Sequence, residues 1–299
     1  MDYPYSVRFG KKFNSLLLAL NYSTRIVLFD NGSLRPEATF SLRRIAAKLS
    51  RRLGERVYPV SLAHSGAIAA EELHGVLARE WPSFLECEVA AGARRFLALP
   101  LFFGPSAAIT RYLPEASSRV LRGRDDVELR VGAALVDLMG RDAGMARILE
   151  GLVLEKLDAM KFGAKPVVVV VDHGSPVQRV VEARDLVARQ LEQALEGRVA
   201  RVVACSMERR EGAEYDFNDP LLEVALEQLW GEGVENALLC PLFFSPGRHA
   251  GVGGDIERIV DGSAWGRAGK ELAFCGLVGE GEGLIDLLAL RYGEISQAP

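Results

Sequence analysis

The chain contains an internal repeat that spans roughly half of its 299 residues. Residues 26–33 read IVLFDNGS and residues 168–175 read VVVVDHGS, while residues 99–106 (LPLFFGPS) match residues 240–247 (CPLFFSPG). Each match is a short apolar run that ends among Gly, Ser and Pro, which is typical of a buried parallel strand followed by a turn. The period is far longer than that of a solenoid. The repeat therefore predicts two copies of one α/β unit.

Two further pairs of strand-like segments extend the repeat. Residues 56–63 match residues 201–208, and residues 128–136 match residues 271–279. Apolar residues recur at helical spacing between the strand-like segments. We therefore expect strand and helix to alternate four times in each half, with a parallel sheet and right-handed crossovers.

The predicted fold class is α/β, with two duplicated lobes that each hold a small parallel sheet flanked by helices. The lobes are predicted over residues 22–160 and 164–295, and residues 163–166 (GAKP) are the expected linker. We expect a cleft between the lobes, because such clefts are favoured places for small ligands. A chain that forms this cleft internally is expected to be a monomer.

Composition excludes several classes of protein. The content of apolar residues (49%) and of charged residues (25%) is that of a globular protein with an ample core. A net charge of -4 gives no reason to expect a nucleic-acid partner. The four cysteines are scattered, which is typical of free thiols in a reducing compartment. No apolar segment is long enough for a signal peptide or a membrane span, so we expect a cytoplasmic protein without a membrane partner.

The two halves differ in their histidines. His173 follows the first strand of the second half, and His249 lies in the loop after its third strand. Their counterparts in the first half are Asn31 and Ala108. The carboxyl ends of parallel strands meet at one edge of a sheet, where ligands bind. A site that uses both histidines is therefore predicted in the C-terminal half.

Glu208 ends the second strand of the same half and could reach the same edge. Neutral imidazole binds divalent cobalt, iron, nickel and zinc, and it also moves protons near neutral pH. His173, His249 and Glu208 are therefore candidates for metal binding or proton transfer, although turn histidines bonded to backbone groups remain an alternative. His64 aligns with Arg209 rather than with either histidine, and an ordinary loop role is expected for it.

Three motifs carry a family resemblance. The segments VDHGSP (171–176), SME (206–208) and PLFFSPGRHA (241–250) resemble the sirohydrochlorin chelatases of the CbiX/SirB type, which are class II tetrapyrrole chelatases. The P-x-F-x-x-x-G-R-H pattern is the most specific part. The resemblance covers residues 165–261 well and extends faintly over the first half, as in the long two-lobed form of the family.

The resemblance implies an activity and a set of residues. By position, His173 and His249 match the metal-binding and catalytic histidines of the family, and Glu208 matches its acidic residue. The implied reaction inserts cobalt(II) or iron(II) into sirohydrochlorin in cobalamin or siroheme biosynthesis, and nickel is compatible with the same ligands. The metal is a substrate, and neither ATP nor an organic cofactor is implied. His249 and Asp255 are separated by AGVGG, whereas many members have a shorter link.

The carboxylates of such a tetrapyrrole require cationic partners. Arg248 adjoins His249, Arg179 follows His173, and Arg209 follows Glu208. Arginine can bind a carboxylate through two parallel hydrogen bonds. We therefore predict that Arg248, Arg179 and Arg209 bind substrate, together with Ser175. Arg184 is explained equally well as a solvated helix charge.

Two other functions fit the sequence. The chain could bind a tetrapyrrole or a metal ion without catalysing insertion, as a carrier or a regulatory relative of the chelatases. A hydrolase that uses Ser175 with His173 is disfavoured, because neighbouring residues at a turn rarely provide the geometry of a nucleophile and its base. The G-x-S-x-G motif of such enzymes is also missing from the sequence.

Overall fold

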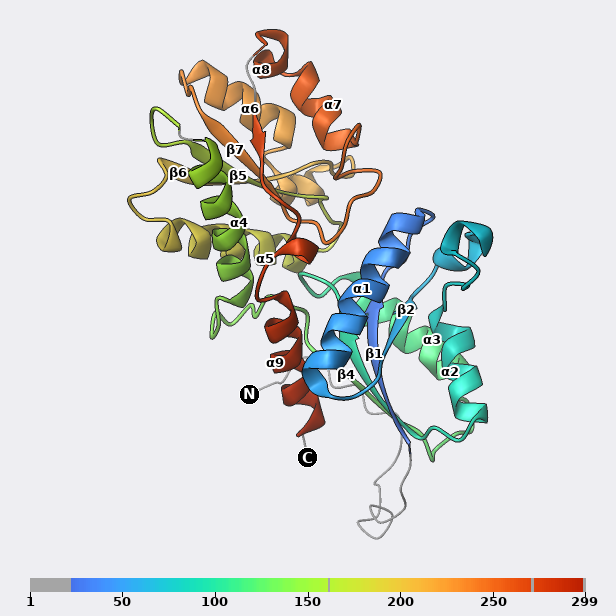
Figure 1. Ribbon diagram of the computed structural model, residues 1–299. Helices are drawn as coiled ribbons and strands as arrows, with labels where there is room; N and C mark the ends of the chain where they lie inside the picture. The colour runs from blue at the N-terminus through green and yellow to red at the C-terminus, as the bar shows by residue number, and fades with distance from the viewer. Residues whose placement is uncertain (1–22, 161, 270–271, 298–299) are drawn as a thin grey trace. The chain divides into compact units, whose positions relative to one another are not determined.

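The computed structural model of the protein describes residues 23–160, 162–269 and 272–297. It divides into two compact units, coloured from blue to red along the chain in Figure 1. The first unit, here called the N-terminal lobe, comprises Met1–Leu135 with Ile285–Pro299, and the second, the C-terminal lobe, comprises Val136–Leu284. Each lobe holds one parallel sheet of four strands, as the sequence repeat predicts.

The sheet of the N-terminal lobe has the strand order β2-β1-β3-β4, and its strands pair in parallel throughout. Apolar residues from both faces of the sheet are buried against the helices. The elements of this lobe are β1 (Thr24–Asp30), α1 (Pro36–Leu53), β2 (Val57–Ser61), α2 (Trp81–Ala90), β3 (Arg95–Pro100), α3 (Leu113–Val120), β4 (Glu128–Val131) and α9 (Leu284–Ser296).

The sheet of the C-terminal lobe has the equivalent order β6-β5-β7-β8. The five valines of its central strand β5 are fully buried, which explains why the run is uniformly apolar. The elements of this lobe are α4 (Gly144–Met160), β5 (Val167–Asp172), α5 (Gln178–Ala194), β6 (Arg201–Ser206), α6 (Leu222–Gly231), β7 (Ala237–Pro241), α7 (Asp255–Gly262), α8 (Ala264–Arg267) and β8 (Ala273–Phe274).

This strand order creates a switch point in each sheet. The chain leaves β5 toward β6 on one side and leaves β7 toward β8 on the other. The loops that follow β5 and β7 therefore separate at the carboxyl edge of the sheet, which is where open α/β sheets bind ligands. His173 and His249 lie in these two loops. The fold thus brings both sequence-predicted histidines to one place.

The compact units differ from the predicted lobes (22–160 and 164–295) at two helices. Helix α4 follows β4 in the sequence but packs against α5 and β7 of the C-terminal lobe. Helix α9 belongs to the N-terminal lobe, where Arg291 donates to the carbonyl of Leu135 at 2.8 Å and Arg130 donates to that of Ile295 at 3.2 Å. Hydrophobic periodicity shows that a helix is amphipathic but not which sheet it covers, so the exchange is invisible in the sequence pattern.

The last strand of each sheet is shorter than the sequence indicates. β4 ends at Val131 rather than at residue 136, and β8 comprises Ala273–Phe274 within the predicted segment 271–279, whose first residue lies outside the described residues. Glycine follows soon after each strand, at positions 132 and 276. Apolar residues continue beyond these glycines because the loops stay buried.

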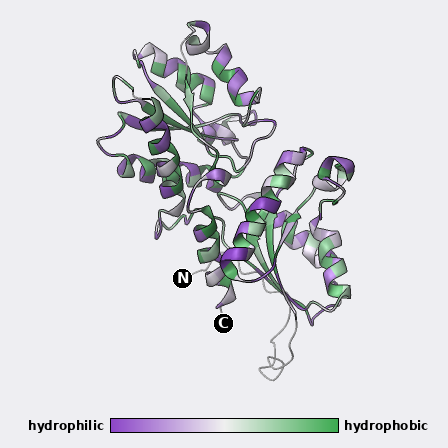
Figure 2. Ribbon diagram, viewed as in Figure 1, coloured by the Kyte–Doolittle hydropathy of each residue, from purple (hydrophilic) through white to green (hydrophobic). Residues whose placement is uncertain are grey.

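Figure 2 shows the pattern that produces these layers, with hydrophobic strands in the middle of each lobe and helices that carry hydrophilic residues on their outer sides. Helix α1, for example, buries Leu42, Ile45 and Leu49 at helical spacing. Within the described residues, no helix is both long enough and apolar enough to span a membrane.

Candidate active site

The loop that carries His173 starts as a tight turn. The Asp172 carboxylate accepts a hydrogen bond from the Gly174 N–H at 3.1 Å. Gly174 has a φ of 89°, and a Cβ atom there would lie 1.8 Å from the carbonyl oxygen of Glu208, so the position requires glycine. The N–H of Glu208 donates in turn to the carbonyl of His173 at 3.2 Å. The turn therefore fixes His173 beside Glu208.

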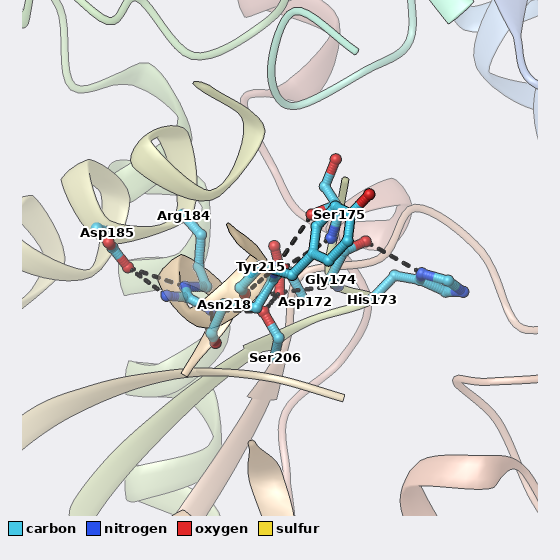
Figure 3. A network of polar contacts seen from close by, with 9 residues as sticks. All are labelled: Asp172, His173, Gly174, Ser175, Arg184, Asp185, Ser206, Tyr215 and Asn218. Atoms are coloured by element: carbon cyan, nitrogen blue, oxygen red, sulfur yellow. Dashed lines mark hydrogen bonds and ion pairs between the residues drawn. The ribbon is translucent and has the colours of Figure 1, made fainter. Parts of the chain in front are cut away.

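A network of polar contacts supports this turn (Figure 3). Arg184 of α5 is 2% exposed and donates to Ser206 Oγ at 2.6 Å and to the carbonyl of Asn218 at 3.1 Å. Ser206 donates to Asp172 at 2.7 Å, and Asn218 accepts from the N–H of Ser175 at 2.8 Å. Burial raises the pKa of Asp172, although Arg184 and Ser206 oppose the shift. Arg184 is thus a structural residue rather than the solvated charge considered from the sequence.

Residues 242–254 form the second loop, between β7 and α7. The Gly247 N–H donates to the carbonyl of Ala250 at 2.8 Å, which folds the chain back on itself. A Cβ atom at Gly254 would lie 2.7 Å from the carbonyl oxygen of His249, so the glycine permits a close approach of the two backbones. The long glycine link noted in the sequence therefore forms a compact turn against His249.

The two histidines meet at the carboxyl edge of the sheet. The ring centroids of His173 and His249 are 4.6 Å apart, and the ring planes are nearly perpendicular at 81°. The ring of Phe243 lies 6.4 Å from that of His249. The side chains of His173 and His249 are 47% and 26% exposed, so both are open to a ligand that arrives from solvent.

Hydrogen bonds set the orientation of both rings. His249 Nδ1 lies 2.8 Å from Asp255 Oδ2, and His173 Nδ1 lies 3.2 Å from the Gly174 carbonyl. Carboxylates and carbonyls only accept hydrogen bonds, so in the neutral rings Nδ1 carries the proton and Nε2 presents a lone pair. His173 Nε2 is 3.5 Å from Glu208 Oε1. A cation placed between these two acceptors would be attracted by both.

Asp255, noted from the sequence only for its spacing from His249, is a further candidate residue of this site. It is the first residue of α7, and its carboxylate also lies 3.4 Å from Arg248 Nε and 2.9 Å from Arg258 Nη1. Desolvation opposes ionisation, but the hydrogen bond with His249 and the two guanidinium groups outweigh it and hold the pKa of Asp255 below its ordinary value. The sequence did hold a signal for Asp255, because it is an acidic residue at the start of a helix, shortly after His249.

The predicted substrate arginines differ in their surroundings. Arg248 is 73% exposed and lies beside the histidine pair through its contact with Asp255. Arg179 is exposed in the first turn of α5, in the segment that follows the His173 loop. Both guanidinium groups are accessible to an anionic ligand.

Arg209 and Ser175 have structural partners. Arg209 is 26% exposed and forms ion pairs with Asp216 and Asp219, each at 3.0 Å. Ser175 Oγ accepts from the N–H of Val177 at 3.1 Å and so supports the start of α5. These contacts account for both residues without a substrate. The serine also has no bond to His173 of the kind that a hydrolase would need, because His173 Nδ1 contacts the Gly174 carbonyl instead.

The donor set is that of an open site. Across residues 23–160, 162–269 and 272–297, no group of three or more His, Cys, Asp or Glu side chains is arranged to hold a metal ion. The histidine pair can supply two nitrogens, and the remaining coordination positions would be left to water or to another ligand. Structural metal sites are closed by four protein ligands, whereas open positions are typical of sites that act on a substrate.

The N-terminal lobe repeats the turn without the candidate histidine and glutamate. Asp30 accepts from the Gly32 N–H at 3.0 Å, and a Cβ atom at Gly32 would lie 1.7 Å from the carbonyl oxygen of Ala63. Ala63 thus occupies the place of Glu208, and Asn31 that of His173. His64 is exposed with a φ of 69°, one position further along, as the alignment with Arg209 predicts. The lobe retains the fold of the site but not its chemistry.

Comparison with known proteins agrees with the geometry in the C-terminal half. Residues 167–295 match the model of the CbiX family. This CbiX segment contains both histidines, Glu208 and Asp255, and it confirms the resemblance inferred from the sequence motifs. A search of curated proteins finds no match to the chain.

Solved structures share the fold over both lobes. SirB from Bacillus subtilis with Fe3+ is 16% identical and superposes with a TM-score of 0.69 over 92% of this chain and 96% of that chain. The sirohydrochlorin chelatase SirB from Bacillus subtilis subspecies spizizenii, in complex with cobalt, is 14% identical with a TM-score of 0.67 over 93% and 97%. A multi-domain protein from Deinococcus radiodurans with structural similarity to chelatases is 18% identical, with a TM-score of 0.59 over 91% and 55%. The predicted chelatase-like fold, with a CbiX segment in its second half, is thereby confirmed.

Proposed function

We propose that the protein inserts a divalent metal ion, cobalt or iron, into sirohydrochlorin, as a step of cobalamin or siroheme biosynthesis. The observation that carries the proposal is the pair of Nε2 lone pairs on His173 and His249, set 4.6 Å apart between ring centroids with Glu208 beside them. The CbiX match of this segment and the likeness to chelatases that were solved with iron and cobalt support it.

The reaction replaces two pyrrole N–H bonds by two metal–nitrogen bonds and releases two protons. The histidine pair would hold the incoming ion through Nε2 while its other positions stay open to the ring nitrogens. Glu208 is 60% exposed and 3.5 Å from His173 Nε2, so it can accept a pyrrole proton and pass it to solvent. His173 can accept the second proton once the ion has left its Nε2. The exchange balances without ATP, a redox partner or an organic cofactor.

The substrate carboxylates would bind to accessible cations near the pair. Arg248 is the strongest candidate, because its guanidinium group contacts Asp255, the partner of His249, and is open to solvent. Arg179 is the second, at the start of α5. Arg209 and Ser175 remain candidates from the sequence. Their contacts with Asp216, Asp219 and Val177 favour a role in supporting the loops.

The decisive test is an anaerobic absorbance assay with purified protein, sirohydrochlorin, and cobalt(II), iron(II) or nickel(II) in separate arms. We expect the spectrum of the metallated ring to form faster than in the control without protein, at a rate that His173→Ala and His249→Ala reduce to the background. The matched control is His64→Ala, which removes an exposed loop histidine from the N-terminal lobe and should leave the rate unchanged. Circular dichroism establishes that each variant is folded.

The same assay separates the main alternative. If the tetrapyrrole binds with a spectral shift but metal enters no faster than without protein, the chain is a carrier or a regulatory relative rather than a chelatase. Full activity of either histidine variant would refute the residue assignment even if the chain is a chelatase.

A further inference from the structure

A cleft of about 460 Å³ lies in the N-terminal lobe. Its residues belong to a different sheet from that of the histidine pair. It is bounded by helix α1, the edge strand β2 and the extended segment 76–79. Its volume falls in the range of ordinary small-molecule sites, about 300–1,000 Å³. The lining residues are Thr39, Leu42, Arg43, Ala46, Ala47, Ser50, Arg56, Val57, Tyr58, Pro59, Ser61, Val76, Leu77, Ala78 and Arg79.

The charge of the lining is one-sided. Arg43, Arg56 and Arg79 contribute three guanidinium groups, and the described residues that line the cleft include no Asp or Glu. Arg79 has an acidic partner in Glu88, whose carboxylate lies 3.5 Å from Arg79 but 2.6 Å from a fourth arginine, Arg25. Desolvation lowers the pKa of Arg43, so an anion nearby would offset an existing cost. The cleft therefore has an excess of positive charge.

The rest of the lining is apolar. Val76 and Leu77 are 60% and 61% exposed, which is unusual for two neighbouring aliphatic side chains beside a cleft. The ring of Tyr58 contacts two of the arginines, with Arg56 at 4.7 Å and Arg79 at 5.7 Å from its centroid. Positive groups around an apolar surface suit a ligand with an anionic head and an apolar body.

The C-terminal lobe shows that the fold does not require these charges. Counted from Asp30 and Asp172, the counterpart of Arg43 is Asp185, which forms an ion pair with Arg184 at 2.7 Å. The counterpart of Arg79 is Pro220. The carbonyl of Arg79 accepts a hydrogen bond from the N–H of Ser61 at the end of β2, and the carbonyl of Pro220 accepts the equivalent bond from Ser206 at the end of β6.

The third arginine differs in its partner. Arg201 is the counterpart of Arg56 by strand register, and its guanidinium group is paired with Glu232. The cationic lining is thus a property of one lobe and not of the duplicated scaffold.

We propose that this cleft binds a small organic acid, with its carboxylate on Arg56 and Arg79 and its apolar body against Val76 and Leu77. A carboxylate matches the fork of two N–H groups that a guanidinium offers, and both arginines are exposed. The site is separate in residues from the proposed metal-insertion site, so it adds a second ligand to the protein.

Isothermal titration with three probes tests the class of ligand. Octanoate combines a carboxylate with an apolar body and should bind. Acetate lacks the body and octanamide lacks the charge, so each should bind at least tenfold more weakly. Equal affinity for acetate would reveal a bare anion site, equal affinity for octanamide would reveal an uncharged apolar groove, and either result overturns the proposal.

Variants locate the binding. Arg56→Gln/Arg79→Gln should weaken octanoate binding at least tenfold, whereas the matched control Arg201→Gln in the C-terminal lobe should not change it. Arg56→Gln alone alters an exposed side chain and provides a second variant if the double variant unfolds; we expect a threefold or greater loss. Octanoate binding that survives both variants, or that Arg201→Gln weakens equally, would place the ligand elsewhere and refute the site.

Discussion

At the scale of single residues, the candidate site includes a carboxylate that orients one of the two histidines. Asp255 fixes the ring of His249 through Nδ1 and so decides that Nε2 faces outward. The sequence identified the histidines and Glu208 because each follows a strand of the repeat. It did not reveal the role of Asp255, because that role depends on how the glycine turn folds back before α7.

Asp255→Asn should lower the rate of metal insertion. The amide removes the charge that favours the present tautomer of His249, and partners of this kind are commonly worth about 10–100-fold in metal affinity or activity. We expect a loss in that range, together with a change of the His249 tautomer in the ¹⁵N NMR spectrum. Asp261→Asn, in the same helix and exposed, is the control. A lower rate with an unchanged tautomer would show that Asp255 acts in another way.

Asp30 makes the stability of the protein depend on pH. Burial raises the pKa of this carboxyl from 3.8 to about 6, while hydrogen bonds from Ser61 and Gly32 oppose the shift. The folded state therefore binds the proton more tightly than the unfolded state, so stability is highest below pH 3.8 for this group and is lost as pH rises through about 6.

Asp30→Asn should remove that dependence. At pH 7 we expect the variant to gain about 1–3 kcal/mol in the free energy of unfolding, because it no longer ionises in a buried place. At pH 4.5 the gain should shrink. Urea titrations at the two pH values measure the difference, and an equal effect at both would mean that Asp30 is not the titrating group.

At the scale of elements, both lobes use the same turn between the first strand and the first helix. The repeat of D-x-G-S in the sequence predicted the turn, but not that its glycine lies against a carbonyl two residues beyond the end of the neighbouring strand. That contact involves residues far apart in the chain. Periodicity and turn signals report local structure and leave such packing undetermined.

Gly174→Ala should disrupt the site more than the fold elsewhere. Its positive φ alone costs about 1–2 kcal/mol for a residue with a side chain, and the clash with Glu208 should add ~1–3 kcal/mol. Gly197→Ala is the matched control, because Gly197 has a φ of 77° and nothing within 4 Å of the added Cβ atom. Thermal unfolding and the insertion assay together should show the larger loss for Gly174→Ala. Equal losses would mean that the contact with Glu208 is dispensable.

At the scale of the whole molecule, the lobes are not consecutive in the chain. Helix α9 completes the N-terminal lobe, and its buried Arg291 reaches the carbonyl of Leu135. The sequence repeat predicted the two parallel sheets. It assigned the last helix of each half to the wrong unit, because an amphipathic pattern does not indicate which sheet a helix covers. The units follow from contacts that only the folded chain displays.

Removal of residues 285–299 should therefore destabilise the N-terminal lobe. We expect hydrogen exchange to accelerate in β1 and β3 of the truncated protein, because it lacks Leu288 and Arg291, which are buried in that lobe. The amides of β5 and β7 should keep their protection. Faster exchange in β5 and β7 alone would contradict the assignment of α9.

The position of α9 also bears on the order in which the protein is made. Residues 136–284 leave the ribosome before the helix that completes the N-terminal lobe. Domains usually fold in the order of their synthesis. Here the N-terminal lobe, whose strands are translated first, cannot be completed until α9 has been made. The C-terminal lobe with the histidine pair is therefore complete while the N-terminal lobe still lacks a helix.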